Sequence, residues 1–275
     1  MPELPEVETV VRDLRPLVCG HRITDVVTGP HRLRRPWRDE WNERVVGRTV
    51  QALDRRGKWI IAELDSPARL LVHLGMTGQF TVAPLTDPLP THTHWYLVLD
   101  GRWRWQFRDI RRFGSVELLA DAPTLEAFLA KRLGPEPFAL QAQAWLVTLN
   151  KSQRPLKALL LDQAVVAGVG NIYADEALFA AGLHPLHPGA ATTPAQAERL
   201  RVALAAVLTR AIDERGSTIR NYVGGSGLAG RYQTAFAVYG RAGQACRQCG
   251  TEIGCIRVAG RSTHYCPTCQ PQASA

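Results

Sequence analysis

Residues 246–269 read CRQCGTEIGCIRVAGRSTHYCPTC, in which sixteen residues separate two Cys-x-x-Cys pairs. Two such pairs at this spacing are typical of a four-thiolate zinc site, and disulfides are the weaker interpretation in a chain without an apparent secretion signal. Four thiolates leave no open coordination position for water, so we expect a structural zinc ion. The expected ligands are Cys246, Cys249, Cys266 and Cys269, with His264 as a competing ligand. The two remaining cysteines, Cys19 and Cys255, are expected to be small buried residues.

The composition of the 275-residue chain is that of a folded protein with a polyanionic partner. Hydrophobic residues make up 45% and charged residues 21%, which excludes a mainly disordered chain. The 33 basic residues outnumber the 25 acidic ones for a formal net charge of +8, and all but four of the basic residues are arginines. Arginine suits bidentate phosphate contacts, although genomic codon bias accounts for such a count equally well. No apolar run reaches the roughly 18–20 residues of a membrane helix, and we expect a cytoplasmic protein.

The N-terminal half begins with an expected helix and continues as β-structure. Val7, Val10, Val11 and Leu14 recur at helical spacing after Pro5, a residue that suits the first turn of a helix. Residues 21–120 instead contain short apolar runs separated by Gly, Pro and Asp, which indicates a β-sandwich or a β-barrel. These runs include residues 59–61, 70–72 and 96–99.

The C-terminal half is predicted to be helical. The Leu-Gly-Pro-Glu-Pro stretch at 133–137 predicts a domain boundary, and an alanine-rich helical pattern follows over 139–215. A Gly-Val-Gly-Asn turn at 168–171 interrupts this pattern, and a glycine-rich loop is expected at 224–230. We therefore expect an α+β protein with four segments: an N-terminal helix and β-sandwich domain at 1–133, a linker at 134–150, a helical domain at 151–240, and the zinc hairpin with its tail at 241–275.

The N-terminus carries a candidate nucleophile. Removal of Met1 would expose the secondary amine of Pro2, which can attack a sugar C1′ and form an iminium, as a lysine forms a Schiff base. The reference pKa of an α-amine lies near 7.7–8.0, so a much larger fraction of it than of a lysine is neutral at pH 7. Glu3 beside it could pass a proton to the sugar ring oxygen. Taken alone, the same residues are more simply interpreted as the lead-in to a helix.

Three further stretches combine residue types that contact nucleic acids. Residues 73–78 place Met76 between two glycines, and residues 103–114 interleave arginines with aromatic residues. Lys157 precedes the glycine turn at 168–171, whose backbone N–H groups could hold a phosphate at the start of a helix. Each stretch has a structural alternative: a β-turn with a core methionine, a pair of strands with one solvated face, and a helix–turn–helix packing unit.

In combination, these motifs resemble those of bacterial formamidopyrimidine-DNA glycosylase, the base-excision enzyme for oxidised purines. The resemblance covers Pro2 to about Gln270 and rests on PELPEVET at 2–9, RGK at 56–58, HLGMTG at 73–78, RRFG at 111–114, LDQ at 161–163, GVGNIY at 168–173, VYGR at 238–241, and the four cysteines with Arg261. It implies the fold of that family, an N-terminal helix with a β-sandwich, followed by a helix–two-turns–helix domain and a zinc hairpin.

The resemblance also implies a role for each matching residue. Pro2 would attack C1′ of the damaged nucleotide, Glu3 would protonate the ring oxygen, and Glu6 would support that site. Lys58 would donate a proton in β-elimination or contact a phosphate, and Arg261 would hold the phosphates that flank the lesion and assist δ-elimination. Met76, Arg111 and Phe113 would fill the gap left by the flipped base, with Arg111 facing the orphaned cytosine. The residues expected to grip the DNA backbone are His73, His92, Arg112, Lys157 and Asn171.

The function that the resemblance implies is that of a bifunctional DNA glycosylase. Such an enzyme removes 8-oxoguanine and formamidopyrimidines from damaged double-stranded DNA and then cleaves the strand by β,δ-elimination. We expect a monomer with one structural Zn²⁺, without a membrane or a stable protein partner, at the bacterial nucleoid. Three alternatives stay open: an endonuclease VIII-like glycosylase for oxidised pyrimidines, a non-catalytic zinc-hairpin DNA-binding protein, and a zinc-bearing ribosomal or RNA-binding factor. Leu4 after Pro2-Glu3, and Met76 with Arg111 and Phe113, favour the purine-specific branch.

Overall fold

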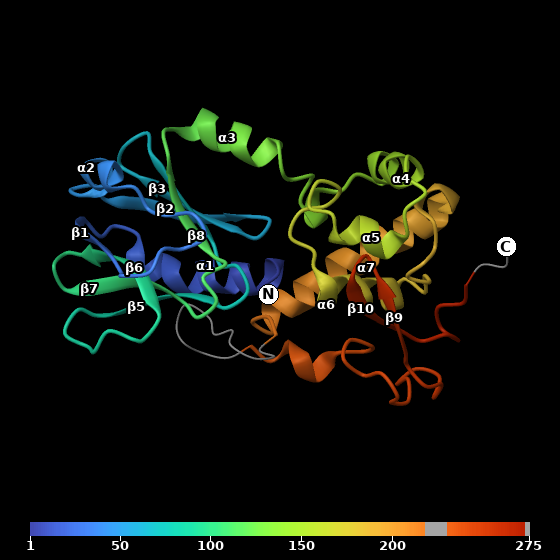
Figure 1. The fold of residues 1–275 in the computed structure, drawn as a ribbon. Helices are drawn as coiled ribbons and strands as arrows, with labels where there is room; N and C mark the ends of the chain where they lie inside the picture. Colours follow the sequence, from blue (N-terminus) through green and yellow to red (C-terminus); the bar gives the residue numbers. More distant parts are fainter. Residues whose placement is uncertain (218–229, 273–275) are drawn as a thin grey trace. The chain divides into compact units, whose positions relative to one another are not determined.

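The computed structural model describes residues 1–217 and 230–272. These residues form two compact units, drawn in Figure 1. The first unit contains residues 1–131 together with the described parts of 214–233. The second contains residues 132–213 together with the described residues from 234 onward. Among the residues described, no helix is long and apolar enough to cross a membrane.

The first unit is built from helix α1 (Leu4–Val18) and two antiparallel four-stranded sheets (Figure 1). The strand orders of the two sheets are β1-β6-β7-β5 and β2-β3-β4-β8. Helix α1 contacts β2 and β3 of one sheet and β5 of the other. The strands are β1 (Ile23–Thr28), β2 (Val50–Arg56), β3 (Trp59–Leu64), β4 (Arg69–His73), β5 (Gly78–Pro84), β6 (Thr93–Leu99), β7 (Trp103–Asp109) and β8 (Ser115–Leu119). Three short helical segments complete it: η1 (Asp39–Trp41), α2 (Asn42–Val45) and α3 (Ala122–Ala130).

The core of the first unit confirms the expected N-terminal helix and the expected β-structure. The four apolar residues at helical spacing in α1 are at most 1% exposed and pack against residues of both sheets. Large aromatic side chains belong to the same core, and the rings of Phe80 and Trp105 stack with centroids 4.6 Å apart. The three apolar runs noted in the sequence lie in β3, β4 and β6. This core holds fixed the loops at one end of the strands, which carry the candidate functional residues.

The second unit consists of helices and the C-terminal hairpin. Helix α6 (Asn171–Ala180) contacts α5 (Leu156–Leu161), the long α7 (Pro194–Asp213) and strand β10 (Arg261–Tyr265). The other elements are η2 (Pro137–Ala139), α4 (Ala142–Asn150), η3 (Gly189–Ala191), β9 (Gly254–Val258) and the last two residues of η4 (Tyr232–Ala235), whose first two residues belong to the first unit. The expected helix after the Gly-Val-Gly-Asn turn is confirmed as α6, and the hairpin pairs β9 with β10.

Two of the expected segment boundaries are wrong. Residues 134–150 are not a linker, because they contain helix α4, in which Trp145 and Leu149 are at most 2% exposed and pack within the second unit. The expected helical domain at 151–240 also does not form one body, since residues 214–217 and 230–233 belong to the first unit. Residues 214–217 do so because Arg215 and Ser217 bond to α1, as described below, and residues 230–233 follow because the backbone N–H groups of Arg231 and Tyr232 donate to Glu214 and Gly216. Residues 224–229 of the expected glycine-rich loop lie outside the described residues.

Candidate functional site

The start of α1 brings the first three candidate residues together. Pro2 is buried, Glu3 is 3% exposed and Glu6 is 2% exposed. Glu3 is the N-cap of the helix, and its backbone N–H donates to Glu6 Oε2 at 2.8 Å in a reciprocal capping box. This arrangement fixes the backbone directly after Pro2, at an acidic residue. The sequence Glu-Leu-Pro-Glu therefore starts the helix and also gives the N-terminal end of the helix a fixed backbone conformation.

Glu6 also binds residues 214–217 to the start of α1 through hydrogen bonds. The backbone N–H and the hydroxyl of Ser217 donate to Glu6 Oε1 at 2.8 and 3.0 Å. Gly216 has φ +72°, and a Cβ there would lie 2.8 Å from Glu6 Oε1, so only glycine fits this close approach. Arg215 reinforces the contact by pairing with Asp13 at 2.7 Å. With its carboxylate occupied by these donors, Glu6 is suited to hold the site together rather than to move protons. Sequence reasoning did not find Ser217, which lies far from Glu6 along the chain.

Lys58 lies in the turn between β2 and β3, and His73 is the last residue of the neighbouring strand β4. Lys58 is 5% exposed and follows Gly57, which turns β2 into β3 with φ +58°. His73 ends β4, and its Nδ1 accepts the Gly75 N–H at 3.0 Å. Its ring contacts Trp59 edge-on with centroids 4.7 Å apart. Burial, and then the positive charges of Lys58, Arg34 and Arg35, lower the pKa of His73 to about 4.

This environment defines the form in which His73 can act. At neutral pH the ring is uncharged, and because Nδ1 accepts a hydrogen bond, the proton of the neutral ring sits on Nε2. His73 therefore offers a neutral N–H donor to a ligand oxygen rather than a positive charge.

The lowered pKa of His73 also makes a prediction for stability. Between about pH 6.5 and pH 4 the unfolded chain binds a proton at this histidine that the folded protein does not, so the free energy of unfolding should fall as pH falls through this window. In His73→Asn the amide oxygen can still accept the Gly75 N–H, but nothing titrates there. Denaturant unfolding at pH 7.5 and pH 5 should show a smaller acid loss in the variant than in the wild type. Equal losses would contradict this account.

Two loops at the ends of the strands carry the residues expected to enter the DNA. Met76 lies in the turn between β4 and β5 and is 37% exposed. Phe113 lies between β7 and β8, is 45% exposed, and has the guanidinium of Arg111 over its ring at 4.6 Å. An exposed methionine and an exposed phenylalanine beside an arginine fit insertion between bases better than a core role. Arg112 lies in the second loop, and the carbonyl of His92 accepts the N–H of Asp109 just before it; both residues are exposed and have positive φ.

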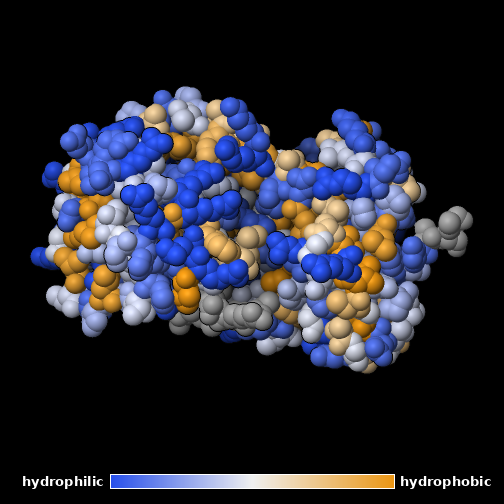
Figure 2. All heavy atoms as spheres, viewed as in Figure 1, coloured by the Kyte–Doolittle hydropathy of each residue, from blue (hydrophilic) through white to orange (hydrophobic). Residues whose placement is uncertain are grey.

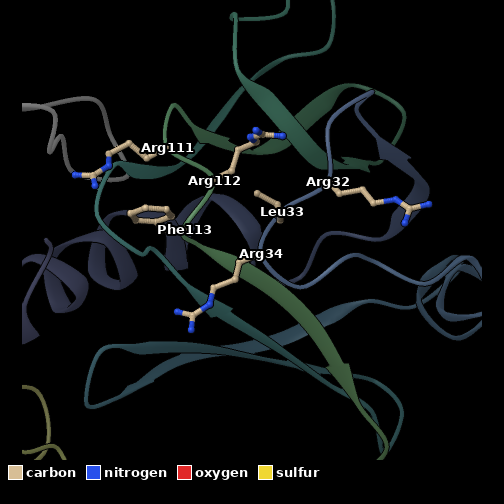
Figure 3. Close-up of a pocket in the computed structure, with 6 residues that line it drawn as sticks. All are labelled: Arg32, Leu33, Arg34, Arg111, Arg112 and Phe113. Atoms are coloured by element: carbon tan, nitrogen blue, oxygen red, sulfur yellow. The ribbon is translucent and has the colours of Figure 1, made fainter.

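An open pocket beside the second loop adds residues that the sequence analysis missed. It is lined by Arg32, Leu33, Arg34, Arg111, Arg112 and Phe113 (Figure 3). Figure 3 shows the four guanidinium groups fanning outward around the apolar side chains of Leu33 and Phe113. Figure 2 shows hydrophilic residues gathered over much of the visible face of the same unit. The signal in the sequence was HRLRRPWR at 31–38, an arginine cluster similar to the one at 108–112.

In the second unit, Lys157 does not lie where the sequence expectation requires. Its side chain is 0% exposed, and its ammonium donates to Asp175 Oδ1 at 2.5 Å and to the Asn171 carbonyl at 2.8 Å. A buried ammonium that is fully committed to protein acceptors does not reach a DNA phosphate, so we correct this assignment. The side-chain amide of Asn171, at the start of α6, donates to the Ser262 carbonyl at 2.9 Å.

Asp175 links the buried lysine to the hairpin. Its Oδ2 accepts the backbone N–H of His264 at 2.9 Å and contacts the His264 ring at 3.1 Å. Arg261 begins β10, directly after the tight turn at Ala259 and Gly260, and is exposed. The hairpin is therefore seated on α6 through Asp175, and it presents Arg261 on its outer edge.

The four expected zinc ligands converge at the base of this hairpin. The Sγ atoms of Cys246, Cys249, Cys266 and Cys269 all lie within 4.8 Å of one another. The backbone N–H groups of Gln248 and Cys269 donate to Cys246 Sγ and Cys266 Sγ, each at 3.4 Å, as backbone groups do around metal-bound thiolates. This donor set fits one tetrahedral zinc ion. His264 is turned toward Asp175 instead, and Cys255 is exposed on β9, contrary to the burial expected for it.

Comparison with known proteins gives the same family along the chain. Residues 1–116 match the formamidopyrimidine-DNA glycosylase N-terminal domain, residues 133–223 its H2TH domain, and residues 243–272 the zinc finger found in FPG and IleRS. The formamidopyrimidine-DNA glycosylase of Thermus thermophilus is 47% identical over 98% of both chains. That of Geobacillus kaustophilus is 43% identical over 98% of this chain and all of its own.

A solved structure supports the same assignment. The complex of wild-type Lactococcus lactis Fpg (MutM) with DNA containing N7-benzyl-Fapy-dG superposes with a TM-score of 0.91 at 36% identity. The match covers 98% of this chain and 100% of that one.

Proposed function

The chain belongs to the formamidopyrimidine-DNA glycosylase family, and we propose that it excises oxidised purines through an iminium on Pro2 and then cleaves the strand. It is a zinc-finger DNA glycosylase of base-excision repair whose partner is damaged DNA. The observation that supports the proposed mechanism is the buried, capped start of α1, in which Glu3 directly follows Pro2 in the chain.

The chemistry begins after removal of Met1. The lone pair of the Pro2 nitrogen forms a bond to C1′ while Glu3 gives a proton to the ring oxygen and the bond from that oxygen to C1′ breaks. The N–H proton of the nitrogen then passes to Glu3, and the bond from C1′ to the base breaks, so that the base leaves with the electron pair and an iminium remains between C1′ and Pro2. The capping box keeps the Glu3 backbone from moving, which limits how far the Glu3 carboxyl group can move relative to the Pro2 amine.

Strand cleavage follows from the iminium. Loss of a proton from C2′ breaks the bond to the 3′ phosphate, and loss of a second proton, from C4′, breaks the bond to the 5′ phosphate. We assign proton donation in the first step to Lys58, and we assign the hold on the flanking phosphates and the assistance of the second step to Arg261. Hydrolysis of the remaining Schiff base returns the free Pro2 amine.

Binding is assigned to the exposed loops of the first unit and to the hairpin edge of the second. Met76, Arg111 and Phe113 are proposed to occupy the gap left by the extruded nucleotide, because extrusion costs a few kcal/mol that a wedge offsets. Arg112, His92 and the neutral Nε2–H of His73 are proposed to contact phosphates, and Asn171 to do so at the start of α6. To these we add Arg32 and Arg34, whose guanidinium groups line the pocket beside Arg111. Since duplex DNA is the substrate, we place the protein in the cytoplasm, at the bacterial nucleoid.

The proposed function can be tested with end-labelled duplexes at one fixed salt concentration. A duplex with 8-oxoguanine opposite cytosine should be cleaved, and an undamaged duplex should not. Preferential cleavage of a duplex with thymine glycol would assign the enzyme to the oxidised-pyrimidine branch instead. Binding without cleavage would leave only a zinc-hairpin DNA-binding protein, and tighter binding of RNA than of lesion DNA would favour an RNA-binding factor.

A further inference from the structure

The two loops that carry Met76, Arg111 and Phe113 touch each other through their backbones. Gly75 has φ +61°, and a Cβ there would lie 2.5 Å from the backbone nitrogen of Gly114. Gly114 has no room for a side chain either, since its Cβ would lie 2.5 Å from the ring of Phe107. Glycines at these two positions therefore allow the turn after β4 and the turn after β7 to pack back to back.

One buried carboxylate bonds to both loops. Asp109, the last residue of β7, is 0% exposed. Its Oδ2 accepts the Gly114 N–H at 2.8 Å, and its Oδ1 accepts the Thr77 hydroxyl at 2.5 Å. The backbone N–H of Arg111 donates both to this Oδ1, at 3.3 Å, and to Thr77 Oγ1, at 3.1 Å. The two carboxylate oxygens of Asp109 thus hold one donor from the Met76 loop and two from the Arg111–Phe113 loop.

Asp109 is itself firmly placed. It pairs with Gly78 of β5, and its backbone N–H donates to the His92 carbonyl at 3.0 Å. Its carbonyl accepts His94 Nε2 at 3.0 Å and the Arg112 N–H at 3.3 Å. The carboxylate of Asp109 therefore has a fixed position at the end of the sheet, and both loops are hydrogen-bonded to it. A buried carboxylate is costly unless donors surround it, so a residue of this type at this position requires an explanation beyond filling space.

We propose that Asp109 is the positioning residue of the DNA wedge, the set of side chains formed by Met76, Arg111 and Phe113. Asp109 holds the two loops that carry these side chains as one rigid body. This inference rests on the proposed function, because the wedge matters only if a nucleotide is extruded. Asp109 touches neither the sugar nor the base. It acts through the three side chains that fill the gap, whose loops would otherwise move independently and lose the gap-filling geometry.

The test separates reactions that need the wedge from one that does not. Excision of 8-oxoguanine from a duplex requires the gap to be held open, whereas cleavage at an abasic site in single-stranded DNA has no gap to fill. Asp109→Asn loses one acceptor and turns an amide N–H₂ toward a loop donor. We expect duplex excision to fall about tenfold to a hundredfold, the range for a lost hydrogen bond to a charged group, with single-stranded abasic cleavage within about twofold of wild type.

Thr77 provides a matched pair of variants for the same bond network. Thr77→Val keeps the shape but removes the hydroxyl that bridges Asp109 and the Arg111 N–H, so it should show the same selective loss in weaker form. Thr77→Ser restores the hydroxyl and should restore duplex excision. Fluorescence of 2-aminopurine placed opposite an abasic analogue reports wedge insertion directly. In the protein–DNA complex it should be lower for Asp109→Asn and Thr77→Val than for the wild type, and unchanged for Thr77→Ser.

Combination with Phe113→Ala makes the proposal falsifiable. If Asp109 acts through the wedge, the double variant Asp109→Asn/Phe113→Ala should excise no more slowly than the slower single variant. Multiplied losses, or an equal fall in single-stranded cleavage, would reduce Asp109 to a general stabiliser of the fold and overturn the proposal. A wild-type protein that cleaves neither substrate would instead refute the proposed function, so the two failures are distinguishable.

Discussion

A single glycine inserted between Met1 and Pro2 should abolish strand cleavage at 8-oxoguanine. Once Met1 is removed, the Pro2 nitrogen of this variant is an amide, which has no lone pair available to attack C1′. We expect the rate of cleavage to fall by at least about 10³-fold, as for removal of other catalytic nucleophiles, and borohydride to trap no covalent adduct. Single-turnover cleavage and mass mapping of the reduced, digested protein measure both quantities.

The companion variant Glu3→Gln separates attack from base release. Its Pro2 amine is intact, so borohydride should still trap an adduct on Pro2 with a preformed abasic site, whose C1′ aldehyde needs no base to leave. With intact 8-oxoguanine the same variant should release little base, because the proton for the ring oxygen is missing. Binding of both variants to a duplex with a non-reactive abasic analogue should stay near the wild-type value. An adduct on a lysine in either protein would assign the nucleophile elsewhere.

The sequence predicts those parts of the site that depend on local pattern. The helical spacing of Val7, Val10 and Val11 after Pro5 identifies α1. The two Cys-x-x-Cys pairs predict the sulfur cluster for the same reason, because each pair is one turn and the hairpin needs only two short strands. In each case the interacting residues are near neighbours along the chain, so their chemistry can be read without knowing the fold.

The errors lie where burial and long-range pairing decide. Lys157 looks like a phosphate ligand next to a glycine turn, but Asp175, on the next helix, neutralises it in the interior. Ser217 and Asp109 have no distinctive local pattern, yet each bonds to a segment that is distant in sequence. Residues 134–150 read as a linker because of their prolines, whereas Trp145 and Leu149 pack against helices that the local pattern cannot place. A single sequence carries no record of such tertiary partners.

Loss of the zinc should affect DNA binding more than the chemistry at the N-terminus. The hairpin has a small core of its own, formed by Val238, Cys246, Ile253 and Cys266, which is too small to fold β9 and β10 without the metal. We expect Cys266→Ser to lose its zinc and to weaken binding to an abasic-analogue duplex by at least about a hundredfold, since Arg261 is then no longer presented from a fixed strand. Zinc content by metal analysis and fluorescence anisotropy at fixed salt measure the two effects.

Cys255→Ser is the matched control, because Cys255 lies on the same hairpin, is exposed, and stands apart from the four converging sulfurs. It should keep one zinc ion per chain and bind DNA as the wild type does. In Cys266→Ser, single-turnover cleavage at saturating protein should recover much of the wild-type rate, because Pro2 and Glu3 are mounted on α1 within the first unit. First-step cleavage, by β-elimination, that stays lost at saturation would mean that Arg261 contributes to the first elimination step in addition to the second step assigned to it. Undiminished affinity without zinc would show that the hairpin does not hold the DNA.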